Sequence, residues 1–192
     1  MHKLKSGFTL VVLSISSIIM LVERCSAQAP PRTPTPARPA GAVTAGPPKI
    51  YATLAQLMRG TLFPSSNLIF FAQDKNPDDV PQAKDPSTAT DPLASSYGKW
   101  QAIENAALAM GEVANLLTIT GRKCSNGIDA PVKNADWLKF VDGLREASVA
   151  AYKAAQSKNQ DNMLMVSEVL VTACGNCHDK YREKPNLADR CK

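Results

Sequence analysis

The chain has 192 residues, a formal net charge of +5, five cysteines and only two histidines. Its lysines and arginines are scattered along the sequence, which argues against nucleic acid as a partner, because that would need clustered basic side chains. The shortage of histidine excludes histidine-rich metal clusters and a Ser-His-Asp triad.

The N-terminal segment predicts an exported protein. A basic start precedes an apolar run over residues 8–22, and a small-residue cleavage site ends at Ala27. As a helix the run spans only about 23 Å, which is short for a hydrocarbon core of about 30 Å. We therefore expect a signal peptide over residues 1–27, a periplasmic mature protein and no stable membrane span after cleavage.

A proline-rich stretch follows the predicted signal. Residues 28–49 hold seven of the fourteen prolines among alanine, threonine and glycine. Such a composition cannot build a core and predicts an extended linker. The remaining residues, 50–192, suit one domain with a single core.

The first predicted helix of that domain is the least regular. Its apolar seam begins at Ile50, but Pro64 interrupts it. Because proline lacks an N–H and its ring crowds the preceding turn, it ends or kinks a helix. The sequence therefore predicts one piece over residues 50–62, a second over 65–73, and a long loop over 74–96.

Three further stretches carry apolar residues at alternating spacings of three and four. They begin near Tyr97, Ala135 and Met163, and Asn159 is predicted to cap the last one. Stripes of this kind are what the helices of a four-helix bundle bury. No stretch shows sustained period-2 alternation, so the sequence predicts an all-α, antiparallel up-and-down four-helix bundle.

The last stretch contains the sequence Cys174-Gly175-Asn176-Cys177-His178, which is the C-x-x-C-H attachment signature of a covalent haem c. Spacings of three and four residues bring both thiols and the imidazole to one helix face. Cys174 and Cys177 are therefore predicted to bind one haem through thioethers, and His178 to bind its iron. Signal cleavage would leave His178 as the mature chain's only histidine, which excludes a second histidine ligand.

The sixth position on the iron is open to a methionine, another ligand, water or nothing. Met163 and Met165 share a helix with His178 but lie roughly 20 Å away along its axis, too far to reach. Met110 is expected to fill the core. Met58, near the start of the first helix, is the predicted ligand, and a vacant or water-filled site is the main alternative.

Signal cleavage would remove Cys25, which leaves two cysteines of the mature chain outside the motif. Cys124 and Cys191 are both expected at the haem end of the bundle, and an exporting compartment favours a disulfide between them. The loop of nearly seventy residues that it would close corresponds to roughly 4 kcal/mol in the chain-entropy model, less any strain. Two unpaired thiols are the alternative.

The single C-x-x-C-H near the C-terminus, its continuation Cys-His-Asp-Lys-Tyr-Arg and the four predicted helices resemble the class II cytochromes c, the cytochrome c prime group and its methionine-ligated low-spin relatives. The resemblance covers about residues 50–183. It implies an antiparallel four-helix bundle in which the motif's thiols and imidazole hold the haem. It also implies that Arg182 lies near the propionates, and that Met58 matches the methionine of the low-spin relatives.

Two functions fit these expectations. A haem with histidine and methionine ligands has a raised potential and no open site, which favours a one-electron carrier that works with a redox partner protein. A five-coordinate haem in an apolar pocket would instead bind NO or CO. A thiol oxidoreductase is disfavoured because the motif lies near a helix C-terminus, and a zinc site built from the four mature cysteines and His178 is equally disfavoured. We expect no enzymatic activity, because no nucleophile–base pair can be assembled, and a homodimer stays open.

Overall fold

The computed structural model describes residues 46–192. The predicted signal peptide and most of the predicted linker, within residues 1–45, lie outside the described residues. None of the helices between residues 46 and 192 combines the length and apolar character needed to cross a membrane. That part of the chain also contains no β-strand, and a single antiparallel bridge joins Lys123 to Asp129.

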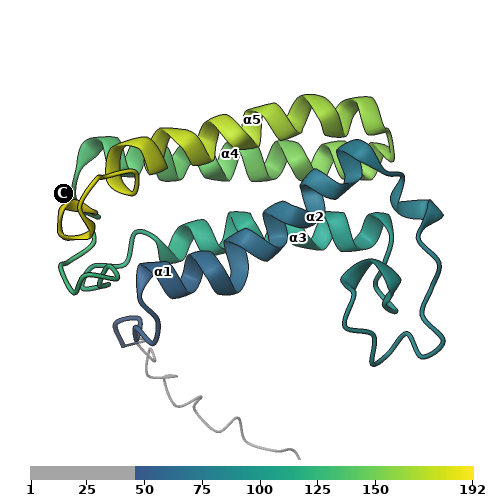
Figure 1. Cartoon of the computed structure of the whole chain (residues 1–192), viewed down its shortest axis with the longest axis horizontal. Coiled ribbons are helices and arrows are strands. Elements are labelled where there is room, and N and C mark those ends of the chain that lie inside the picture. Colours follow the sequence, from purple (N-terminus) through teal and green to yellow (C-terminus); the bar gives the residue numbers. More distant parts are fainter. Residues whose placement is uncertain (1–45) are drawn as a thin grey trace, which may run out of the picture. The chain divides into compact units, whose positions relative to one another are not determined.

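Four helices that pack against one another build the domain (Figure 1). The first helix, residues 54–74, consists of α1, a π-helical turn and α2 in direct succession. α2 packs against α3 and α5, and α4 packs against the same two helices. This confirms the predicted four-helix fold class. The bounds are α1 Leu54–Leu57, the π turn Met58–Leu62, α2 Phe63–Asp74, α3 Trp100–Leu116, α4 Ala135–Ser157 and α5 Gln160–Tyr181.

The predicted break at Pro64 is wrong, because the first helix continues through it. A π turn precedes the proline, and the N–H of Phe63 donates to the carbonyl of Met58 five residues back. In an α-helix Pro64 would leave the carbonyl of Gly60 without a donor and would press its ring against it. The wider π turn accommodates the ring, so the helix stays continuous and Met58 lies within the irregular turn.

Buried polar contacts hold the start of the first helix. Arg122, only 3% exposed, lies in the segment after α3. Its guanidinium donates to the carbonyls of Ala52 (2.6 Å) and Leu116 (3.0 Å). The N–H of Leu54 donates to the carbonyl of Lys123 (2.8 Å). The segment after α3 is therefore fixed against α1.

The connections between helices follow local sequence signals. Asn159 caps α5 as predicted, since its side chain accepts from the N–H of Asn162 (3.1 Å). The predicted loop before α3 holds two short 3-10 turns, Pro77–Asp79 and Pro92–Ala94. The indole of Trp100, at the start of α3, donates to the carboxylate of Asp78 (3.1 Å), so this loop is tied to the helix that follows it.

Candidate haem site

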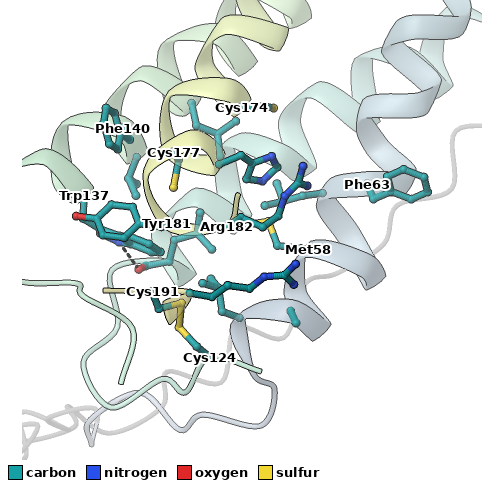
Figure 2. A pocket seen from close by; sticks show the side chains of 18 of the residues that line it. Met58, Phe63, Cys124, Trp137, Phe140, Cys174, Cys177, Tyr181, Arg182 and Cys191 are labelled. Carbon is teal, nitrogen blue, oxygen red and sulfur yellow. Dashed lines mark hydrogen bonds between the residues drawn. A yellow bond between two sulfur atoms is a disulfide. The ribbon is translucent and has the colours of Figure 1, made fainter. Parts of the chain in front are cut away.

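A cavity of about 370 Å³ lies among all four helices. Its walls come from the start of the first helix, the end of α3, the start of α4 and the end of α5, and most of its lining side chains are apolar. Figure 2 shows it from close by. The five residues that the sequence proposes for haem binding all line this cavity: Met58, Cys174, Cys177, His178 and Arg182.

Cys174 and Cys177 are the two cysteines of the described chain that form no disulfide. Both are half-buried and lie three residues apart on α5. Burial raises the pKa of both thiols, and the pKa of Cys177 rises to about 11 with further contributions from Cys174 and Asp136. The thiols are therefore protonated at neutral pH, whereas the nucleophile in thiol–disulfide exchange is the thiolate.

Cys124 and Cys191 form the predicted disulfide, which joins positions 67 residues apart. Cys124 follows α3, and Cys191 is the next-to-last residue of the chain. Both line the same cavity, and Figure 2 shows the bond on the side away from Cys174. The disulfide thus fastens the C-terminal tail beside the cavity.

His178 is half-buried on the last turns of α5. Burial lowers its pKa, and the positive charge of Arg182 lowers it further, while Glu183 and Asp179 act in the opposite direction. A lowered pKa keeps the imidazole neutral at physiological pH. Only a neutral imidazole has a free nitrogen lone pair for a metal, so His178 is in the state that iron ligation requires.

Two thioethers reach the cavity, where the sequence predicted one. Met58 is half-buried in the π turn, and Figure 2 shows it across the cavity from α5. Met110, only 1% exposed on α3, lines the same cavity. Its spacing matches the core stripe of α3, and it is buried as predicted. Sequence spacing alone could not reveal that this part of the stripe faces a cavity.

An aromatic cluster forms one wall of the cavity. Tyr181, at the end of α5, meets Trp137 edge to face with ring centroids 5.1 Å apart, and meets Phe140 at 6.4 Å. The indole N–H of Trp137 donates to the carbonyl of Leu117 (3.0 Å). These rings join α4 to α5 and to the end of α3, and the two polar groups that they carry, the indole N–H and the tyrosine hydroxyl, are both hydrogen-bonded.

A carboxylate holds the outer edge of that wall. The Tyr181 hydroxyl donates to Asp136 (2.6 Å), the N–H of Trp137 donates to the same oxygen (2.9 Å), and Lys180 forms an ion pair with the other oxygen. Lys180 and then Tyr181 are the main causes that lower the pKa of Asp136 to about 2. The end of α5 is therefore locked to the start of α4.

Three arginines line the cavity, where the sequence singled out one. Arg182 is exposed and forms an ion pair with Glu183, whereas Arg59 and Arg190 take part in none of the ion pairs of the described chain. The Nε atom of Arg190 is buried and has no hydrogen-bond partner among the described residues. The only sequence signal for Arg190 is its position next to a disulfide cysteine.

These side chains fit a covalently bound haem. The thiols can form thioethers, the neutral imidazole and a thioether can bind iron, and the arginines can bind carboxylates. The partnerless Nε of Arg190 is the donor that an anionic group in the cavity would satisfy. Across residues 46–192, no group of three or more His, Cys, Asp and Glu side chains could hold a metal ion.

The chain matches no protein-family model, no curated protein and no solved structure.

Proposed function

We propose that this protein is an exported mono-haem c-type cytochrome that carries single electrons to or from a redox partner protein. One observation carries the proposal: the C-x-x-C-H side chains on α5 and the thioether of Met58 on the first helix line the same apolar cavity. Met58 and His178 are 120 positions apart in sequence and line one cavity, and with the two motif thiols they are the set that a covalently held, six-coordinate haem would need.

Each of these residues has a role in the proposal. Cys174 and Cys177 would hold the haem through thioethers, and His178 and Met58 would bind its iron. A bound haem supplies a one-electron iron couple, and a methionine ligand raises its potential. The aromatic wall excludes water, which strengthens electrostatic interactions inside the cavity.

We further propose that the helices form an antiparallel up-and-down bundle, as in the class II cytochromes c. The origin of the cavity walls supports this, because the end of α3, the start of α4 and the end of α5 all contribute to one cavity. In an up-and-down bundle these termini meet at one end, together with the start of the first helix.

Absorption spectroscopy tests the proposal. The full chain, expressed in a host competent for cytochrome maturation, should yield covalent haem by the pyridine haemochrome assay. Its reduced form should show a sharp low-spin α band that changes little under CO. Colourless protein would refute the proposal, and a broad high-spin spectrum that shifts under CO would replace the carrier with the gas-binding alternative.

Met110 provides a matched control for Met58, because both thioethers line the cavity. Met58→Ala should convert the low-spin spectrum into a high-spin, CO-reactive one. Met110→Ala should leave the low-spin spectrum in place. An unchanged spectrum in the Met58 variant would show that Met58 does not bind the iron. A change in the Met110 variant alone would identify Met110 as the ligand.

A further inference from the structure

The C-terminal tail is fastened on both sides of Arg190. The disulfide from Cys191 joins it to Cys124, and the N–H of Cys191 donates to the carbonyl of Tyr181 (2.8 Å). The side-chain amide of Asn126 donates to the carbonyl of Arg190 (3.0 Å) and to that of Leu187, three residues earlier (3.1 Å). The backbone at Arg190 is therefore held against the segment after α3 and the end of α5.

The side chain of Arg190 faces the cavity from this fixed backbone. It lines the same cavity as Met58 and His178, and its Nε is buried without a hydrogen-bond partner in the part of the chain described. A guanidinium carries its charge at every physiological pH. Arg190 as a whole is half-buried, but its buried Nε loses a hydrogen bond unless an acceptor lies in the cavity.

The lining offers few groups that could serve as this acceptor, because most of its side chains are apolar. Arg182 already pairs with Glu183, and Arg59 contributes a further positive charge to the same cavity. Three cations around one apolar cavity fit an anionic ligand group, and the planar guanidinium matches a carboxylate best.

We propose that the disulfide-fastened tail is a carboxylate clamp in which Arg190 donates from its buried Nε to a propionate of the bound haem. This inference rests on the proposed function, since the propionates are the anionic groups of that cofactor. The disulfide acts as the positioning element, because it keeps Arg190 at the cavity while the rest of the tail follows the surface. Removing either the guanidinium or the disulfide should leave the negative charge of the propionate without a positive partner.

The midpoint potential of the holoprotein tests the clamp. Loss of a positive charge beside the haem stabilises the oxidised form, so Arg190→Gln should shift the potential to lower values. Arg190→Lys should restore part of the shift, because it keeps the charge without the Nε donor. Arg145→Gln is the control, since Arg145 lies on α4, pairs with Asp142 and does not line the cavity, and it should leave the potential unchanged.

A double-mutant cycle separates the contribution of the disulfide to the midpoint potential from that of the Arg190 side chain. The paired change Cys124→Ser with Cys191→Ser should shift the potential in the same direction, and adding Arg190→Gln should then shift it little further. An unchanged potential in Arg190→Gln would overturn the clamp and leave water as the acceptor. Fully additive shifts would overturn the positioning role of the disulfide. Haemochrome assays on every variant identify the remaining case, in which the wild type carries no covalent haem and the proposed function itself fails.

Discussion

The two ends of the helical domain are built differently. At the packed end, side chains from all four helices are completely buried and fill the space between them: Ile69, Ala72, Ile103, Ala155 and Met163. At the cavity end, the same helices enclose about 370 Å³, and the side chains of Cys174, Cys177, His178 and Met58 are only half-buried. The same four helices therefore enclose a filled core at one end and a cavity at the other.

The difference indicates which end contributes to stability through packing and which end is shaped to hold a ligand. Close packing holds the packed end, whereas disulfide, aromatic and ionic ties hold the cavity end, where packing is incomplete. A substitution at the packed end should therefore lower the free energy of unfolding with little effect on the proposed haem. A substitution at the cavity end should act on the proposed haem, and it should also lower the free energy of unfolding where it removes one of the ties.

The disulfide is the tie whose loss should have the largest effect. Replacing Cys124 and Cys191 with serine opens a loop closed across 67 positions, so the free energy of unfolding should fall by roughly 4 kcal/mol. Denaturant unfolding, monitored by far-ultraviolet circular dichroism, measures the loss. A decrease below about 1 kcal/mol would show that packing, and not the covalent link, holds the cavity end.

Much of the molecule could be predicted from the sequence where the signal is local or periodic. The alternation of three and four positions predicted α4 and α5, because each buries a continuous stripe against its neighbours. The leftover cysteines predicted the disulfide by elimination. The helical spacing of the C-x-x-C-H motif brings its side chains to one face, and all three line the cavity.

The rest depends on contacts that no local signal encodes. Pro64 predicted a break, but the π turn keeps the helix continuous, and whether a helix can absorb a proline depends on what packs against it. Met110 fits an ordinary core stripe, and only the shape of the cavity makes it a lining residue. Arg190 reaches the cavity because the chain folds back after α5. No periodic pattern in the sequence predicts this change of direction.

The next largest effect sharpens the contrast between the two ends. Met163 is 0% exposed at the packed end, so Met163→Ala should lower the free energy of unfolding by about 2–5 kcal/mol through lost packing and the cavity that it leaves. The low-spin spectrum should stay unchanged. Met58→Ala, by contrast, should change the spectrum. A spectral change in the Met163 variant would contradict the separation between packing and chemistry.

The smallest effect concerns the ionic tie at Asp136. Its pKa in the folded protein is lowered from 3.8 to about 2, chiefly by Lys180 and Tyr181. A carboxyl with a lowered folded-state pKa contributes stability that is present above its unfolded pKa and is lost as pH falls through the folded pKa. Between about pH 4 and pH 2 the wild type should therefore lose stability more steeply than Asp136→Asn.

Unfolding curves of the holoprotein at several pH values across this window measure the difference. The exposed pair of Lys123 and Asp129 (2.8 Å) provides the control, because an ion pair in solvent contributes little. Asp129→Asn should follow the wild-type pH profile, whereas Asp136→Asn should flatten it. Parallel profiles for all three proteins would mean that the aromatic rings alone hold α5 to α4 at the cavity end.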